Sequence, residues 1–413
     1  MQRIRMSLTY FKDFGWEPEV VTVYPKHADV LKDDLLLESI PKDIVIHYVN
    51  AFEKKWTRKF GLGSLALRSI WFYKQKVNSL LKSKKYDLIY FSTTEYTLCT
   101  LGPHWKKRFS IPYVIDFQDP WHSNYYLDKP KQDRPSKYWF SYRLNKYLEP
   151  IALKKVDGII SVSEAYINTF YDRYPITIDI PSATITFGAF ETDFEIAKKH
   201  HDSLRSSVLI ENENFINIVY AGRGGHDMYD AAKLLFEGFK SGLASDYSFF
   251  TKIRFYFIGT SYAPNGSGKK TIQPIANELE VGDYVFEFTD RISLYNSINT
   301  FLSANALVIL GSNDTEYTAS KIFPYILSRK PILALFNEQS SAYQIIKTCN
   351  AGTIISLSDT ETGITNIVSF LQSLKNPVLK NDTKWDLFET FSARNMTCKQ
   401  CELFDKVITY AGK

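Results

Sequence analysis

Glu316 is the acidic residue whose surroundings say most about chemistry in this chain. It lies in a polar loop between an apolar run that ends at Gly311 and a stretch of small hydroxyl residues. This pattern predicts a strand, a loop, a helix start and then a second strand after Pro331. Free N–H groups and the helix dipole make such a helix start attractive to phosphate. An acid beside it indicates a ligand with an anion and hydroxyl groups, and a nucleotide-sugar is one such ligand.

Gly222 and Arg223 form a second group at the end of a predicted strand, 215–221. When a sugar–diphosphate bond breaks, charge develops on phosphate oxygens. A cation and helix N–H groups can stabilise that charge without a metal. Arg223 is well placed to be this cation. The alternative is that 222–225 is an ordinary strand-to-helix turn, because its glycines lack the third member of a dinucleotide motif.

A third group follows the predicted strand 112–117. Asp119 is the candidate base or hydrogen-bond acceptor for an incoming acceptor, with His122 as the second candidate. Asp116 is expected to be structural and to cap the turn after the strand. The alternative for Asp119 is turn chemistry with Pro120.

Predicted strands and helices alternate through the whole chain. Each of the three groups follows one of these strands. Continuous apolar strands separated by helices predict parallel sheets covered on both faces, so the fold class is α/β with two doubly wound domains. Helices are predicted at 3–15, 63–81, 138–155 and 385–410. Strands are predicted at 19–24, 43–49, 86–92, 112–117, 156–162, 215–221, 253–259, 284–288, 306–311 and 331–336.

Composition excludes several classes of protein. The 413 residues are 45% hydrophobic and 15% aromatic, which argues against disorder, and a net charge of +5 does not demand nucleic acid. No apolar run has the length of a membrane-spanning helix, the first residues lack a signal-peptide core, and four cysteines form no disulfide framework. The sequence therefore predicts a reduced, cytoplasmic protein.

Several segments, taken in order, resemble family-4-type glycosyltransferases, including bacterial members that build polysaccharides. The N-terminal half carries 85–92, 111–121 and 156–164, and the C-terminal half carries Gly222-Arg223, 257–259, Glu316 and Lys330-Pro331. The resemblance covers essentially the whole chain. It implies the GT-B fold, in which two Rossmann-like domains flank an interdomain cleft.

The resemblance also implies the activity and the site. A GT-B enzyme of this family moves a sugar from a nucleotide-sugar to a glycan or lipid-linked acceptor. The resemblance also implies retention of configuration and independence of metal, and it implies no cofactor. The catalytic residues would be Asp119, His122 and Glu316, the last contacting sugar hydroxyls. Donor-binding roles are implied for Gly222, Arg223, Arg291, Tyr317, Thr318, Ser320 and Lys321.

Two positions depart from the family pattern. The second acid of the E-x7-E motif, which holds the ribose, would fall at Pro324. A proline fits there if it lies in the first turn of the helix. The lysine that usually follows the arginine is also missing; Lys233 is too far along, and His226 or Lys321 would have to substitute. A GT-B nucleotide-sugar epimerase and a catalytically impaired relative therefore remain alternatives.

We expect an acceptor-binding domain at 1–190 and a nucleotide-sugar-binding domain at 215–384, joined by a linker at 191–214. A helix at 385–413 is expected to cross back to the N-terminal domain. No opening strand is predicted for the first domain, so either the domain is built without it or, as we favour, the sequence starts at an internal Met. Cations mixed with aromatics at 54–60, running into 65–71, could rest on the inner face of an anionic membrane, and a solvated basic surface is the alternative.

Overall fold

The computed structural model describes residues 2–28, 33–57, 63–124, 127, 131, 134, 138–204, 209, 212, 214–263, 266–312, 322–375 and 382–412. These residues divide into two compact units, each described here by itself. Unit 1 comprises residues 1–30, 40–188 and 393–413, and unit 2 comprises residues 31–39 and 189–392.

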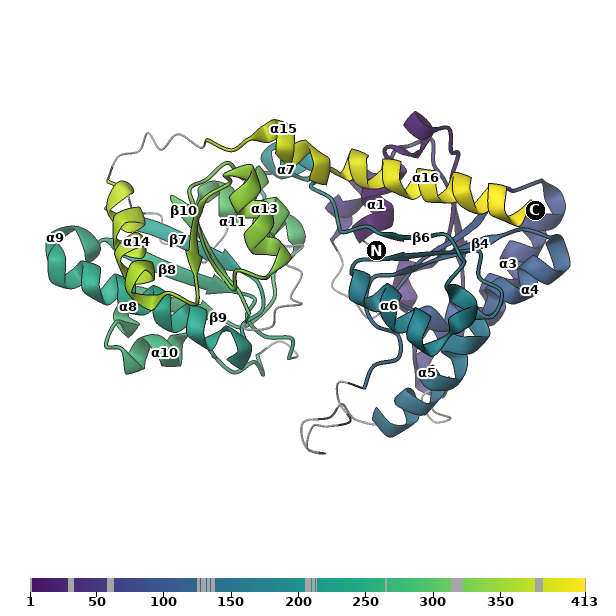
Figure 1. Ribbon diagram of the computed structural model, residues 1–413, viewed down its shortest axis with the longest axis horizontal. Helices are drawn as coiled ribbons and strands as arrows, with labels where there is room; N and C mark the ends of the chain where they lie inside the picture. The colour runs from purple at the N-terminus through teal and green to yellow at the C-terminus, as the bar shows by residue number, and fades with distance from the viewer. Residues whose placement is uncertain are drawn as a thin grey trace. The chain divides into compact units, whose positions relative to one another are not determined.

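Unit 1 is built on parallel strands, as the alternating pattern predicted (Figure 1). The central strands β4 and β5 are buried along their whole length, because helices cover both faces of the sheet. A separate parallel pair, β1 with β2, packs against helix α3. The four-stranded sheet has the order β3 (Ile89–Ser92), β4 (Tyr113–Phe117), β5 (Gly158–Ser161), β6 (Ser182–Thr184), and the pair is β1 (Glu19–Val23) with β2 (Val45–Val49).

Helix α16 (Ala393–Ala411) packs on α1, β5 and β6 of unit 1. The contact is close at Gly158, where a Cβ atom would come within 2.5 Å of the Val407 side chain, so glycine is required there. The other helices of the unit are α1 (Gln2–Leu8), α2 (Lys54–Thr57), α3 (Leu65–Ser83), α4 (Gly102–Phe109), α5 (Tyr138–Leu153) and α6 (Glu164–Arg173).

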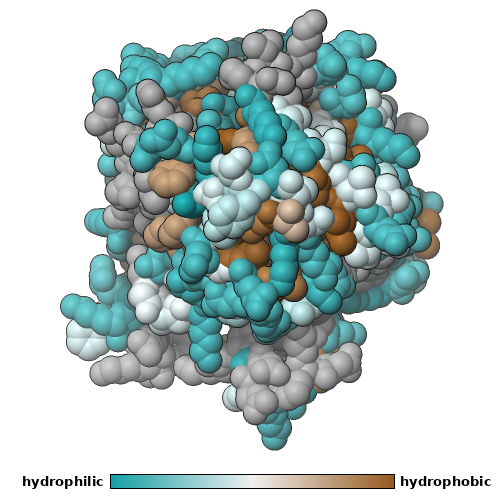
Figure 2. All heavy atoms as spheres, turned by 90° about the vertical axis from the view of Figure 1, so that its left-hand side faces the viewer, coloured by the Kyte–Doolittle hydropathy of each residue, from teal (hydrophilic) through white to brown (hydrophobic). Residues whose placement is uncertain are grey.

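Unit 2 is a six-stranded parallel sheet in the order β12-β11-β10-β7-β8-β9. In Figure 1, α8 and α14 lie on one side of this sheet and α11 and α13 on the other. Figure 2 looks onto the end that carries α9 and α14, where hydrophilic side chains cover most of the surface. The strands are β7 (Ile216–Ala221), β8 (Ile253–Ile258), β9 (Val285–Phe288), β10 (Ala306–Leu310), β11 (Ile332–Phe336) and β12 (Thr353–Ser356).

The helices of unit 2 connect these strands and cover the sheet. They are α7 (Glu191–Lys199), α8 (Tyr229–Ser245), α9 (Tyr247–Phe250), α10 (Gln273–Glu278), α11 (Leu294–Ser303), α12 (Ile322–Leu327), α13 (Ser341–Cys349), α14 (Thr360–Ser373) and α15 (Trp385–Phe388).

Three segments differ from their expected form. The helix expected at 3–15 is α1 followed by a 3-10 turn at Phe11–Phe14. The helix expected at 385–410 is interrupted at Ser392, whose backbone is extended, while the Phe391 carbonyl accepts a hydrogen bond from the Ala189 N–H. The segment expected as a linker contains α7, which packs against α11 through Phe194 and Tyr295.

Candidate active site

The strand order of unit 2 reverses at β7, whose neighbours are β8 on one side and β10 on the other. In an open parallel sheet, ligands bind outside the carboxyl ends of the strands at such a switch point. Gly222 and Arg223 follow β7 there, and Gly311 and Ser312 follow β10. The fold therefore brings the predicted Gly-Arg pair beside the end of the strand that leads to Glu316.

Arg223 forms a bidentate ion pair with Asp227. Arg223 Nη1 donates to Asp227 Oδ1 at 2.9 Å and Nη2 to Oδ2 at 2.5 Å. Ser312 Oγ also donates to Oδ2, at 2.7 Å, across the gap between the two strand ends. The hydrogen bonds from Arg223 are the main reason that the pKa of Asp227 falls to about 2. Asp227 and Ser312 were not predicted as site residues.

The turn that carries Arg223 is tightly packed. Tyr220 Oη donates to the Arg223 carbonyl at 2.8 Å, and the Gly224 N–H donates to the Thr260 carbonyl at 2.7 Å. A Cβ atom at Gly224 would come within 2.5 Å of Thr271 Oγ1. The turn thus needs glycine, and its packing fixes the backbone from which Arg223 projects.

No lysine occupies the position after Arg223 where the family usually has one. Met228 stands nearby, fully buried, with its sulfur 3.8 Å from Tyr220 Oη. Lys233 lies on α8 and faces Glu237 at 3.8 Å, and the exposed His226 precedes α8 in a 3-10 turn. Arg223 and His226 are therefore the basic side chains of this turn.

Arg291 lies after β9 at the same edge of the sheet. Its guanidinium carbon is 4.5 Å from the centroid of the Tyr262 ring, and both side chains are exposed. Glu287 fixes the neighbouring loop by accepting hydrogen bonds from three backbone N–H groups at the start of α10. The Arg291–Tyr262 pair offers a flat cationic surface to a planar group. Tyr262 was not predicted as a site residue.

Glu316, Tyr317, Thr318, Ser320 and Lys321 lie outside the described residues. Their predicted roles stay predictions. Among the described residues helix α12 spans Ile322–Leu327 and includes Pro324. The expectation that this proline lies in the first turn, where its missing N–H would cost no intrahelical hydrogen bond, stays a prediction.

In unit 1, Asp119 is exposed just beyond the carboxyl end of β4. Tyr96 holds its backbone, since the tyrosine hydroxyl accepts from the Asp119 N–H at 2.8 Å and donates to its carbonyl at 2.6 Å. Although the residue is exposed, neighbouring protein atoms partly desolvate the Asp119 carboxyl, and this desolvation raises its pKa. A carboxylate with this environment is a better proton acceptor than one in water.

His122 is buried rather than open to a ligand. Arg173 Nη1 lies 3.2 Å from His122 Nδ1 and donates to the His122 carbonyl at 2.7 Å. The buried Glu149 accepts from the His122 N–H at 3.0 Å and from Tyr174 Oη at 2.9 Å. Burial, reinforced by Arg173 and Lys146, lowers the pKa of the His122 imidazole. Of the two predicted acceptor-side residues, Asp119 is the exposed one.

Asp116 is fully buried and pairs with Arg3, whose Nε lies 2.9 Å from Asp116 Oδ2. Gln118 Nε2 donates to the same oxygen at 2.8 Å and Tyr90 Oη at 3.1 Å. Asp116 thus has the structural surroundings that were expected of it, although its main partner is a distant arginine and not the turn.

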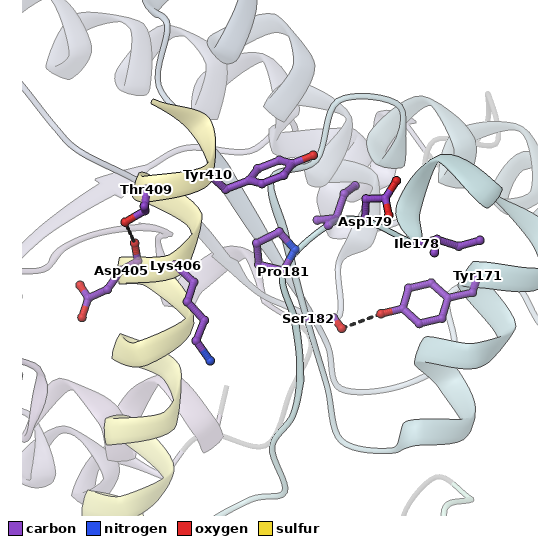
Figure 3. Close-up of a pocket in the computed structure, with 10 residues that line it drawn as sticks. Tyr171, Ile178, Asp179, Pro181, Ser182, Asp405, Lys406, Thr409 and Tyr410 are labelled. Atoms are coloured by element: carbon purple, nitrogen blue, oxygen red, sulfur yellow. Dashed lines mark hydrogen bonds between the residues drawn. The ribbon is translucent and has the colours of Figure 1, made fainter. Parts of the chain in front are cut away.

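A hollow of about 600 Å³ lies elsewhere in unit 1 (Figure 3). It is bounded by α6, the segment before β6 and the last turns of α16. Strands β4 and β6 run parallel. The amino end of β6, beside the hollow, and the carboxyl end of β4, which Asp119 follows, therefore lie at opposite ends of the strands. The hollow therefore contains none of the predicted site residues. Within the described residues, no group of three or more His, Cys, Asp or Glu side chains could hold a metal ion.

Residues 9–180 match the model of Glycosyltransferase Family 4. The whole fold is similar to solved structures of glycosyltransferases with the GT-B fold. The chain has the GT-B fold. The family match covers residues 9–180, less than half of the 413 residues, and the structural matches, all at low identity, show the fold alone. None of the curated proteins matches the sequence.

Three solved structures illustrate the likeness of fold. A glycosyltransferase from Rickettsia africae is 14% identical, with a TM-score of 0.57 over 98% of this chain and 94% of that one. Sucrose-phosphate synthase from Thermosynechococcus elongatus is 13% identical, with a TM-score of 0.55 over 98% and 92%. The N-terminal domain of Candida albicans trehalose-6-phosphate phosphatase is 12% identical, with a TM-score of 0.58 over 98% and 93%.

Proposed function

We propose that this chain is a glycosyltransferase that moves a sugar from a nucleotide-sugar to a glycan or lipid-linked acceptor, with retention of configuration and without a metal. Unit 2 would bind the donor and unit 1 the acceptor. The observation that carries the proposal is the position of Arg223, which projects from a rigid turn at the switch point of the unit 2 sheet. The family match over residues 9–180 supports the reaction class.

On the donor side, Arg223 would neutralise the charge that develops on the departing diphosphate. A guanidinium matches two phosphate oxygens with parallel N–H groups, which makes such contacts strong. Asp227 now accepts both of these N–H groups, so the diphosphate has to share or displace that carboxylate. Arg291 with Tyr262 would bind the nucleotide base. Lys321, Tyr317, Thr318 and Ser320 would contact the donor, and Glu316 would bind hydroxyls of the transferred sugar.

On the acceptor side, Asp119 would accept a hydrogen bond from the attacking hydroxyl group. Its raised pKa suits it to take a share of that proton. In a retaining reaction the departing phosphate can itself receive the proton, so Asp119 would orient the acceptor as much as activate it. A lipid-linked acceptor would require peripheral contact with a membrane surface. Within the residues described, no helix is both long and apolar enough to cross a membrane.

The test begins with a thermal-shift screen of nucleotide-sugars, because a ligand that binds only the folded chain raises its apparent stability. The donor found is then used to measure release of nucleoside diphosphate and formation of glycosylated product. We expect Arg223→Ala and Glu316→Ala to lower turnover strongly. Lys233→Ala is the matched control, since Lys233 lies on α8 beside Glu237.

Two results would contradict the proposal. The first is nucleotide binding without turnover of any donor, which would indicate a catalytically impaired relative. The second is a change of sugar stereochemistry without a glycosylated acceptor, which would indicate an epimerase. Either result would leave the fold unaffected.

A further inference from the structure

Helix α5 has an unusual outer face. Trp139 and Tyr147 are 65% and 69% exposed, and Ile151 is exposed one turn further on. Arg143 and Lys146 lie exposed between them, and the Arg143 guanidinium carbon is 5.9 Å from the Trp139 ring centroid. These five positions recur at helical spacing and face one side of the helix. We refer to these five residues as the α5 stripe.

The exposed charged side chains of this helix, Arg143 and Lys146, are both positive. Its acidic residue, Glu149, is fully buried on the opposite face, where it accepts hydrogen bonds from the His122 N–H and Tyr174 Oη. The exposed face of α5 therefore combines large aromatic and aliphatic groups with cations and contains no acid. Aromatic rings suit the interface between water and hydrocarbon, and cations are attracted to anionic head groups.

The inner face of α5 holds the segment that follows Asp119. Asn145 Oδ1 accepts a hydrogen bond from the Trp121 indole N–H, and Asn145 Nδ2 donates one to the Trp121 carbonyl, both at 3.2 Å. Tyr142 Oη donates to Asn124 Oδ1 at 3.0 Å. The same helix thus carries the stripe on one face and the loop of the candidate acceptor residue on the other.

We propose that the α5 stripe docks unit 1 on an anionic lipid surface. The ring groups enter the interfacial region, while Arg143 and Lys146 pair with lipid phosphates. The evidence for the docking surface is the geometry of α5 alone. Its consequence, that a lipid-linked acceptor reaches Asp119 from the membrane, rests on the proposed function.

A second surface competes for this role. Trp56 is 64% exposed and neighbours Lys54 and Lys55, as the basic-aromatic pattern at 54–60 suggested, although 58–62 lie outside the described residues. The exposed Glu53 interrupts the positive charge there, and α2 is a single turn. Charge complementarity therefore favours α5, and the similar exposure of Trp56 and Trp139 provides a matched comparison.

The experiment measures co-sedimentation of the full chain with vesicles, without donor or acceptor. One set contains phosphatidylcholine alone and the other contains phosphatidylglycerol in addition. We expect binding to the anionic vesicles that weakens with added salt. Arg143→Gln with Lys146→Gln should lower the partition coefficient roughly tenfold or more, since each cation near an anionic surface contributes substantially. Trp139→Ser with Tyr147→Ser should lower it on both kinds of vesicle, and Trp56→Ser should leave it unchanged.

Several outcomes would overturn the proposal. These are no preference for anionic vesicles, loss of binding in Trp56→Ser but not in the α5 variants, or a native mass of two chains that the α5 variants reduce to one. The last outcome would assign the stripe to a second copy of the chain. All four α5 substitutions are at exposed positions, and unchanged thermal midpoints would show that the variants fold. Vesicle binding is measured without donor, acceptor or turnover. Its result therefore tests the docking proposal independently of transferase activity.

Discussion

The buried pair of Arg3 and Asp116 allows a quantitative test of what holds unit 1 together. Arg3 also donates from Nη2 to the Ile185 carbonyl at 2.6 Å and from Nη1 to the Thr186 carbonyl at 3.1 Å. One guanidinium therefore ties α1 both to β4 and to the segment after β6. Both charged side chains are fully buried. The perturbation is Arg3→Met, which keeps most of the volume and removes the charge.

The expected loss follows from the contacts that remain. Removing one partner of a buried ion pair costs about 3–5 kcal/mol, because the other charge is left without compensation. Asp116 still accepts hydrogen bonds from Gln118 and Tyr90, so the loss should lie near the lower end, about 3 kcal/mol. Asp116→Asn should cost a similar amount. In the double variant the two losses should not add, and a coupling of about 2 kcal/mol is expected.

The assay is urea unfolding followed by tryptophan fluorescence. Six of the seven tryptophans lie in unit 1, and Trp385 is the exception, so the signal reports chiefly on this unit. The midpoint should fall by about 1–2 M urea in each single variant. Lys12→Met is the control, because Lys12 and Asp43 form an exposed ion pair in the same unit, and its midpoint should hardly move. Additive losses in the double variant, or a loss below about 1 kcal/mol for Arg3→Met, would refute the reasoning.

Three further outcomes are expected. Arg223→Ala should weaken nucleoside diphosphate binding by roughly ten- to a hundredfold in calorimetry, because charge-assisted hydrogen bonds are lost; unchanged affinity would remove Arg223 from the site. Glu149→Gln should destabilise unit 1 by about 1–3 kcal/mol, since the amide cannot satisfy both the His122 N–H and Tyr174 as the carboxylate does, and urea unfolding checks this. Asp227 has a folded-state pKa of about 2, below its ordinary value, so its stabilising contribution is present above about pH 4 and is lost as the pH falls towards 2. Asp227→Asn should flatten that acid limb of the stability curve, and an unchanged limb would contradict the assigned pairing.

The strands could be predicted because their signal is local. All ten predicted strands are present, with small differences at their ends. The two that were not predicted, β6 and β12, have little local signal: β6 is Ser-Ala-Thr, and β12 has two apolar residues between Thr353 and Ser356. Both lie at sheet edges, where pairing to one neighbour suffices. Tertiary context, rather than an apolar run, makes them strands.

Only those candidate site residues that follow a predicted strand could be proposed from the sequence. Arg223 and Asp119 could be proposed as site residues because each follows a predicted strand, and ligands bind outside the carboxyl ends of parallel strands. Ser312 and Asp227 are 85 residues apart, and they meet because β7 and β10 are neighbours. No local pattern states which strands pair. Glu149 gave a weaker signal, a single acid on the inner face of a helical pattern.

The pairing of Arg223 with Asp227 has a consequence for how the donor would bind. A carboxylate that accepts both outer N–H groups of the guanidinium occupies the geometry that a diphosphate would use. Ser312 supports that carboxylate from the neighbouring strand end, so Asp227 is held in place by two partners. If the donor binds at Arg223 as proposed, its diphosphate would either displace the Asp227 carboxylate or bind the guanidinium beside it. In both cases Asp227 would orient the arginine before the donor arrives, which would lower the entropy lost when the guanidinium binds phosphate.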